Sequence, residues 1–281
     1  MEIQQFLQSF CAGDGLPSGA FISHSRFETV VNFVNDLNQI AYITSNEILL
    51  ASNAIFLPEV RLHDASSLTI SPQTITLDNV IFNRDRMDIY DSSFHFEDFD
   101  LAAFESRLLQ IPSQYSTLFP EKSLIFLVHA ENEKFFPSGF DHQFMLNAKK
   151  GRELILSGEI IKGIETIRGT GYGLTPSGDD FIAGVLLGIH YNESKFKLDL
   201  STLRDKIYLA SIGRNLLTNS FLLNAKQRKY FSPLKKILLL LSGEINSPFR
   251  DALKQLLSIG ATSGADLFSG YIFAIKHKTG I

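Results

Sequence analysis

The sequence contains no tryptophan, a single cysteine and no long apolar run. The lone Cys11 cannot form an internal disulfide, which fits a reducing compartment or a protein indifferent to redox conditions. The longest apolar stretches, residues 181–189 and 237–241, fall far short of the ~20 residues that a membrane-spanning helix needs. Residues 1–5 also lack the basic segment of a signal peptide. These absences predict a cytoplasmic protein.

An excess of positive charge is lacking as well. The 281 residues include 26 Lys and Arg against 30 Asp and Glu, a net charge of −4, and they contain no basic run. Proteins that bind duplex nucleic acid usually present a basic face, so this class of function is disfavoured. Hydrophobic residues make up 44% of the chain, which indicates a globular protein rather than long disorder.

The two halves of the chain have different periodicities. Up to about residue 128, short runs rich in β-branched residues and Phe alternate with turn residues, a pattern typical of a meander or of a small barrel or sandwich. One helix is expected at residues 101–111, ended by Pro112, and residues 27–37 are a candidate for a second. After about residue 141, apolar residues recur at helical spacing. The expected strands are 41–44, 48–50, 68–70, 74–77, 80–82 and 123–128, and the expected helices are 144–156, 160–167, 181–191, 203–223, 234–241, 249–257 and 267–275.

A β-rich half followed by a helical half is the pattern of an α+β fold. We expect a β-rich N-terminal part at residues 1–140 and an α-helical C-terminal part at residues 141–281. The length allows one large domain or two modest ones, so the two parts are either separate domains or layers of one domain.

One short pattern occurs twice in the helical half. Residues 177–184 read Ser-Gly-Asp-Asp-Phe-Ile-Ala-Gly, and residues 263–270 read Ser-Gly-Ala-Asp-Leu-Phe-Ser-Gly. Each Ser-Gly-x-Asp copy opens an expected helix after a loop that contains Gly and Thr. Small residues at helical spacing let helices approach closely, so we expect these two helices to pack together with their N-termini facing a common cleft. The small residues are Gly184, Gly188, Gly270 and Ala274.

Two interpretations of the repeated pattern are open. In a capping box, the Ser oxygen would accept a hydrogen bond from the third helical amide and the acid would reach back to the helix start. Alternatively, free amides at the helix N-terminus would bind an anion such as phosphate or carboxylate. The first copy favours the anion site, because capping needs neither two adjacent acids nor four glycines within ten residues. The four glycines are Gly169, Gly171, Gly173 and Gly178.

The adjacent acids Asp179 and Asp180 would repel a bare anion, so they need another role. They could hold loop amides, move a proton, or bind a divalent cation such as Mg²⁺ that bridges to the anion. The seven His show no metal-ligand spacing, and the glycine loop matches neither a Walker A nor a dinucleotide-binding fingerprint. No cofactor is firmly implied.

The string Gly-Tyr-Gly-Leu-Thr-Pro-Ser-Gly-Asp-Asp-Phe-Ile-Ala-Gly at residues 171–184 resembles the signature of the AllH-type family, a subunit of oxamate carbamoyltransferase from anaerobic allantoin degradation. Residues 260–266 extend the similarity to the second copy. There, Ala261 and Ala265 stand where more polar or bulky residues are expected, so the second copy is predicted to be the weaker site. Looser matches are residues 24–27, 31–32, 56–58, 218–220, 223 and 225.

The resemblance implies a cytoplasmic enzyme component that moves a carbamoyl group between carbamoyl phosphate and oxamate or a related small amide. It also implies partner subunits, including an FdrA-like protein related to acyl-CoA synthetases. Asp180, with Asp179, is predicted to orient or deprotonate the accepting nitrogen in a direct transfer. The alternative is a non-catalytic partner subunit, or a small-anion-binding protein, in which the motifs only cap helices.

Three further residues are candidates for the site. His24 has Ser and Arg as neighbours, while Thr218 and Asn219 place hydrogen-bonding groups in a mostly apolar helix, where such groups need partners. The complete set of predicted ligand-binding residues is Gly171, Gly173, Thr175, Ser177, Gly178, Thr218, Asn219, Ser263, Gly264, Asp266 and His24.

Overall fold

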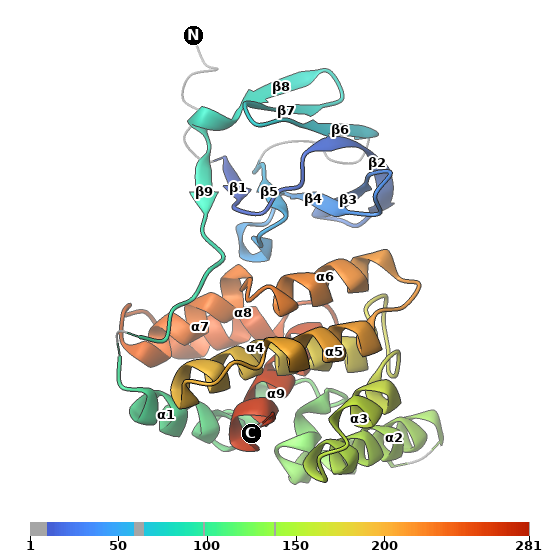
Figure 1. Cartoon of the computed structure of the whole chain (residues 1–281), viewed down its shortest axis with the longest axis vertical. Coiled ribbons are helices and arrows are strands. Elements are labelled where there is room, and N and C mark those ends of the chain that lie inside the picture. The colour runs from blue at the N-terminus through green and yellow to red at the C-terminus, as the bar shows by residue number, and fades with distance from the viewer. Residues whose placement is uncertain (1–9, 59–64, 98, 138, 281) are drawn as a thin grey trace. The chain divides into compact units, whose positions relative to one another are not determined.

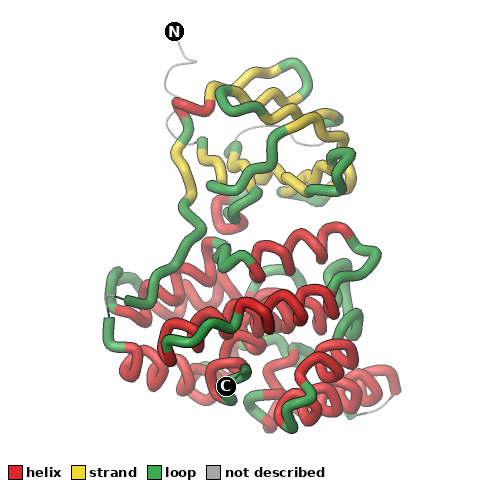
Figure 2. Tube along the Cα trace, viewed as in Figure 1, coloured by secondary structure: helices red, strands yellow, loops and turns green. Residues whose placement is uncertain are grey.

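A computed structural model of the chain describes residues 10–58, 65–97, 99–137 and 139–280. The chain divides into two compact units, Met1–Ser93 with Lys229–Ser232, and Phe94–Arg228 with Pro233–Ile281. The first unit is built mainly of strands and the second of helices (Figure 2). The predicted α+β fold is confirmed. The predicted boundary at residues 140/141 stays a prediction; residues 94–140 lie in the helical unit.

The described strands form one curled nine-stranded sheet in the order β8-β7-β6-β2-β3-β4-β5-β1-β9 (Figure 1). Two antiparallel meanders, β2-β3-β4 and β6-β7-β8, join through the antiparallel pair β2–β6. The pairs β4–β5 and β1–β9 are parallel. The strands are β1 Cys11–Gly13, β2 Gly19–Arg26, β3 Val30–Val34, β4 Ile40–Thr44, β5 Ala54–Phe56, β6 Ser67–Ile70, β7 Thr74–Leu77, β8 Val80–Asn83 and β9 Asp88–Tyr90.

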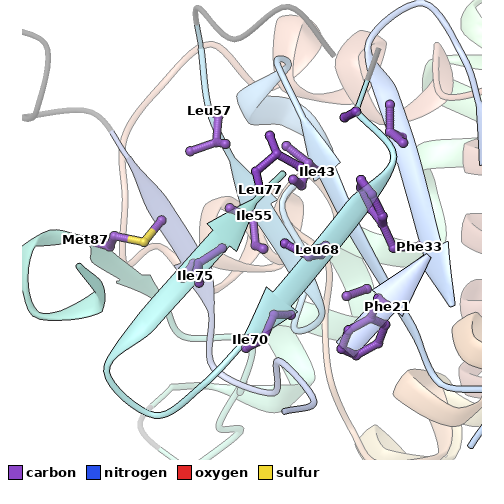
Figure 3. Packing of buried hydrophobic residues seen from close by; sticks show 14 residues of the cluster. Phe21, Phe33, Ile43, Ile55, Leu57, Leu68, Ile70, Ile75, Leu77 and Met87 are labelled. Carbon is purple, nitrogen blue, oxygen red and sulfur yellow. The ribbon is translucent and has the colours of Figure 1, made fainter. Parts of the chain in front are cut away.

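The sheet unit has its own hydrophobic core (Figure 3). Phe21 and Phe33 contribute aromatic rings to it, and aliphatic residues such as Ile43 and Ile55 fill the space between the strands. In β6 and β7 buried and less buried residues alternate, as expected for strands with one face on a core.

A distant segment, Lys229–Ser232, completes the sheet unit. Tyr230 is fully buried; its N–H donates to the carbonyl of Ser92, and its carbonyl accepts from the hydroxyl of Tyr90, both at 2.8 Å. Lys229 pairs with Asp14 at 2.7 Å. Residues far apart in the sequence are therefore needed to satisfy the polar groups at this edge of the unit.

The second unit is built from α-helices with short 3₁₀ turns. None of the helices in the described residues is long and apolar enough to cross a membrane. The 3₁₀ turns used below are η5 Leu124–Leu127 and, in the sheet unit, η2 Glu47–Leu49. The helices are α1 Leu101–Gln114, α2 Gly139–Leu156, α3 Ile160–Ile167, α4 Ser177–Phe196, α5 Ser201–Ser211, α6 Leu216–Lys226, α7 Ser232–Ser242, α8 Phe249–Leu257 and α9 Ser263–Lys276.

The secondary structure predicted for some short apolar segments is wrong, because periodicity alone cannot distinguish short strands from helical turns. The expected strands 48–50 and 123–128 are the 3₁₀ turns η2 and η5, and the candidate helix 27–37 contains strand β3.

Two helix boundaries also differ from the prediction. The expected helix 203–223 is two helices, because the chain turns at Gly213 and the Asn215 side chain caps α6 by accepting from the amides of its first turn. Pro112 does not end α1, which continues to Gln114. Pro112 removes only its own bond to the carbonyl of Leu108, and the residues after it continue the helix, as the bond from the Tyr115 amide to the Ile111 carbonyl shows.

Candidate functional site

Helices α4 and α9 pack backbone against backbone. A Cβ on Gly184 would lie 1.9 Å from the carbonyl oxygen of Leu267, and a Cβ on Gly270 would lie 1.9 Å from that of Phe181. Gly184 and Gly270 hold the same position in the two motifs, as do Phe181 and Leu267. Equivalent residues exchange contacts in this way when an approximate two-fold axis relates two elements. The predicted packing of the two motif helices is confirmed (Figure 1).

The glycine after each motif serine is a second point of close approach. A Cβ on Gly178 would lie 2.0 Å from the carbonyl oxygen of Ile167, and one on Gly264 would lie 1.9 Å from that of Leu256. Ile167 ends α3 and Leu256 lies in the last turn of α8. The pairs α3–α4 and α8–α9 are therefore helix–loop–helix units of the same construction.

The motif serines are the first helical residues rather than caps. Helices α4 and α9 begin at Ser177 and Ser263, which places Pro176 and Thr262 at the N-cap positions. In the described chain neither N-cap residue accepts a side-chain hydrogen bond from its helix. The capping-box interpretation is therefore wrong, and the side chains of the motif make other contacts.

A layer of four hydroxyl groups joins the two helix starts. Ser177 Oγ lies 3.3 Å from Thr262 Oγ1, and Thr175 Oγ1 lies 3.1 Å from Ser263 Oγ. Ser177 is fully buried, whereas the other three are partly exposed. Each motif serine thus pairs with a threonine that precedes the other helix.

The serine of each motif also contacts the acid of the other motif. The hydroxyl of Ser263 lowers the pKa of Asp180, and the hydroxyls of Thr262 and Ser177 lower the pKa of Asp266, as polar groups near a carboxylate do. Thr175 Oγ1 adds a hydrogen bond to Asp180 Oδ2 at 3.2 Å. The two copies therefore form one composite cluster rather than two separate sites.

Both acids of this cluster are buried, with Asp180 2% and Asp266 0% exposed. Burial, followed by the charge of Asp266, raises the pKa of Asp180 well above its usual value. Burial raises the pKa of Asp266 to about 7, although its Oδ1 accepts a hydrogen bond from the Leu124 amide of η5 at 2.6 Å. Two such carboxyls cannot both ionise easily, so near neutral pH the pair retains a proton.

Asp179 holds the glycine-rich loop. Its Oδ1 accepts a hydrogen bond from the amide of Gly169 at 2.7 Å, and its side chain is 6% exposed. Burial raises the pKa of Asp179, while the Gly169 amide and the positive charge of Arg168 lower it again. Of the roles considered for this acid, holding a loop amide is the one visible in its contacts.

The loop from Gly169 to Pro176 adopts a conformation that depends on glycine. Gly171 and Gly173 have φ angles of +100° and +88°, in the left-handed region that other residues rarely adopt. Gly171 lies directly against Ser177, since a Cβ on it would be 2.6 Å from the Ser177 Cβ. Among the described residues, the amides of 171–175 donate no main-chain hydrogen bond.

Tyr172, between these glycines, is clamped to the helical unit. Its hydroxyl donates to Asp141 of α2, and its ring packs edge-on against Phe144, with centroids 5.5 Å apart. Lys122 pairs with the same Asp141 at 2.5 Å. The clamp fixes the middle of the loop, while the neighbouring Gly173 and Leu174 are exposed.

The predicted anion site at the helix starts is only partly available. The amide of Gly178 donates to the carbonyl of Thr170 at 2.9 Å, and that of Gly264 donates to Ile259 at 3.1 Å. These two amides are therefore engaged by the chain itself. The amides of residues 171–175 are the better candidates for anion binding.

The three remaining predicted residues have different surroundings. Thr218 is buried on α6, and within the described chain its hydroxyl has no hydrogen-bond partner. The side chain of Asn219 bonds both the amide and the carbonyl of Gly213, which closes the α5–α6 turn. His24 is exposed on β2 of the sheet unit, and its place in the site stays a prediction.

Three contributors to the cluster were missed by the sequence analysis. Leu124 contributes its amide from a segment that lies 142 positions before Asp266. Thr262 contributes a hydroxyl, and Asn215 ties α6 to the loop by donating to the carbonyl of Leu174 at 2.6 Å. A Thr directly before the second motif was the only sequence signal for any of them.

Within the residues that the structure describes, no three His, Cys, Asp or Glu side chains come together in a way that could hold a metal ion. The cluster itself offers two carboxylates and four hydroxyls. It is therefore suited to hydrogen bonding and proton transfer rather than to tight coordination of a cation.

The comparisons with known proteins agree with the resemblance noted in the sequence. The model of the AllH family, described as oxamate carbamoyltransferase subunit AllH, matches residues 167–275. No curated protein and no solved structure matches the chain. The matched segment begins at the end of α3 and ends in α9, so it contains both motifs and the whole α4–α9 contact. The predicted resemblance to the AllH family is confirmed over this segment.

Proposed function

We propose that the chain is a subunit of a carbamoyltransferase and that the polar cluster between α4 and α9 is its substrate site. There a carbamoyl group would move between carbamoyl phosphate and oxamate or a related small amide. The observation that carries this proposal is the composite cluster of acids and hydroxyls, built from both copies of a repeated motif inside the segment that matches the family.

The parts of the cluster suit the separate tasks of carbamoyl transfer. The phosphate group is bound by the amides of residues 171–175, which make no main-chain hydrogen bond in the described chain, and by the hydroxyl of Thr175. The hydroxyl of Ser263, partly exposed beside Thr175, polarises the carbamoyl carbonyl. Asp180 orients the accepting nitrogen.

The transfer step needs no covalent intermediate. The accepting nitrogen attacks the carbamoyl carbon, the bond from that carbon to the phosphate oxygen breaks, and phosphate leaves with the electron pair. The proton released by the nitrogen passes to the carboxylate of Asp180. A carboxylate whose pKa is raised by burial is a better base than one in water, and Asp180 takes this role when the proton of the pair lies on Asp266.

Partners and cofactors follow from the same proposal. The matched family is described as a subunit, so we propose that the chain works in a complex, with an FdrA-like protein as one candidate partner. Asp179 holds Gly169, which leaves the phosphate charge to be met by amides and hydroxyls. A divalent cation such as Mg²⁺ would then enter with carbamoyl phosphate rather than be held by the chain.

The proposal is tested by measuring carbamoyl transfer in the complex reconstituted from purified subunits. Asp180→Asn keeps the shape of the side chain but removes its basicity, so turnover is expected to fall by ~10²-fold or more. Asp179→Asn is the matched control, since its amide oxygen can still accept from Gly169, and we expect turnover within a few-fold of wild type. Full activity of a folded Asp180→Asn protein would contradict the catalytic role.

The alternative function is a non-catalytic partner subunit; the position of the motif serines inside their helices, rather than at the caps, favours the catalytic proposal. A non-catalytic partner role would still be recognised in the same assay. In that case Asp180→Asn would leave turnover unchanged, while omission of the chain would abolish it.

A further inference from the structure

The two acids of the α4–α9 cluster occupy equivalent positions. Asp180 and Asp266 are each the fourth residue of their motif, and each lies beside the serine of the other copy. The reciprocal glycine contacts at Gly184 and Gly270 fix both helices in this arrangement. The second copy is therefore built into the site as fully as the first.

One buried oxygen of this pair points to a ligand. Asp266 is 0% exposed, and its Oδ1 is satisfied by the Leu124 amide, but in the described chain its Oδ2 makes no hydrogen bond of good geometry. Leaving such an acceptor unpaired costs stability, and a bound donor group would remove this cost. When Asp266 is ionised, the partner of this oxygen must be a donor group.

The charges around Asp180 and Asp266 restrict the chemical class of the ligand that carries the donor group. Asp180, Asp266 and neighbouring Asp179 are all acids, and within the described part of the chain Arg168 is the one cation whose charge acts on them, through Asp179. From η5 the pair receives only the neutral Leu124 amide. An anionic group would be repelled here, whereas a neutral group rich in N–H donors would be held.

We propose that Asp180 and Asp266 together form one two-fold site that receives the N–H groups of a neutral primary amide. The second motif then contributes to ligand binding as much as the first. The phosphate group binds apart from the two acids, at the loop amides of 171–175. The choice of an amide as ligand rests on the proposed function. The two N–H groups of a primary amide match one acceptor oxygen on each side of the local axis.

The hydroxyl layer is more exposed than the two acids. The pairs Thr175–Ser263 and Ser177–Thr262 lie beside the buried acids, and three of these four residues are partly exposed. Since Thr175 and Tyr172 belong to the same glycine-rich loop, we expect ligand binding beside Thr175 to alter the environment of Tyr172.

The test compares two small ligands that differ in one group. Oxamate carries a carboxylate and a primary amide, whereas oxalate carries two carboxylates. Binding to the purified full chain is measured by calorimetry and by the shift of the melting temperature. We expect oxamate to bind and oxalate to bind at least ~10-fold more weakly, because oxalate offers no N–H group.

Variants then test whether both motifs take part. In Asp266→Asn the amide oxygen keeps the Leu124 contact and the new –NH₂ group faces the ligand donors, so oxamate binding is expected to weaken by ~10-fold or more, as in Asp180→Asn. Asp251→Asn, on the exposed side of α8, is the control and should bind as wild type does. Ser177→Ala, which removes a hydroxyl beside Asp266, is a second probe of the same acid.

Each contrary result has a separate meaning. Wild-type oxamate binding in folded Asp266→Asn, with loss in Asp180→Asn, would overturn the two-fold site and leave the proposed function on the first motif alone. Three results would overturn the assignment of an amide as the ligand. The first is equal binding of oxamate and oxalate, and the second is no oxamate binding at all. The third is a rise in melting temperature with Mg²⁺ alone that Asp266→Asn abolishes. Amide binding without turnover in the reconstituted complex would instead count against the proposed function.

Discussion

Asp266 lies in the first turn of α9, where a negative charge would ordinarily favour a helix start. Its side chain is fully buried, and it bonds the Leu124 amide instead of its own helix. Burial raises its pKa from the usual 3.8 to about 7, so its charged form is disfavoured in the folded protein. The acid therefore weakens the fold at neutral pH, a cost that is understandable if it serves the site.

The pH dependence of stability should reveal this cost. Between about pH 4 and pH 7 the folded protein keeps a proton on Asp266 that the unfolded chain has lost, so stability falls as pH rises through this window. Asp266→Asn cannot titrate there. Since one pKa unit corresponds to about 1.4 kcal/mol, we expect Asp266→Asn to be more stable than wild type by about 2–4 kcal/mol at pH 8 and nearly equal at pH 4.

Urea unfolding at several pH values measures this difference directly. Asp251→Asn is a suitable control, because it makes the same change of side chain at an exposed position of α8 outside the cluster. A constant difference between Asp266→Asn and wild type from pH 4 to pH 8 would show that Asp266 is not held in a low-dielectric environment.

The helix pair α4–α9 depends on two glycines in the same register of each helix. A Cβ on Gly184 would meet the Leu267 carbonyl at 1.9 Å, a distance that only a shift of the backbone can relieve. Because both partners are main chain, side-chain repacking offers no relief. The element pair that builds the site is therefore held together by residues without a side chain.

Replacing Gly184 by Ala should force the two helices apart. We expect a loss of at least about 3 kcal/mol in unfolding free energy, at the upper end of overpacking effects, together with loss of oxamate binding because the acid pair separates. Gly213→Ala is the matched control, since a Cβ there meets nothing within 4 Å, and its effect should stay within about 0.5 kcal/mol. A stable Gly184→Ala protein would contradict the observed packing.

The sequence predicted this element pair better than it predicted the chemistry within it. The ungapped repeat and the small residues at helical spacing were enough to pair α4 with α9. The roles of the acids were harder to infer, because Ser-x-x-Asp at a helix start has the local pattern of a capping box. The deciding contacts, from Leu124 and across the two motifs, join residues more than 80 positions apart and leave no periodic signal.

On the scale of the whole molecule, the segment that follows the last strand belongs to the helices. Phe96 is 3% exposed and packs edge-on against Tyr191 of α4 at 5.4 Å and Phe104 of α1 at 6.1 Å between ring centroids. The hydroxyl of Tyr191 donates to the carbonyl of Leu101 and to Glu105, which fixes α1 on α4. Periodicity could not reveal this, because residues 94–99 carry no helical or strand pattern of their own.

Phe96→Ala should show which unit depends on this segment. Removing a buried Phe ring costs about 3–5 kcal/mol, and we expect the loss to appear in the helical unit. Hydrogen exchange should therefore accelerate in α1 and α4 while the amides of β2, β3 and β4 keep their protection. Phe33→Ala, in the core of the sheet, should give the opposite pattern. Loss of protection in the strands but not in the helices of Phe96→Ala would place the folding boundary near residue 140, as the periodicity of the sequence suggests, instead of at Ser93.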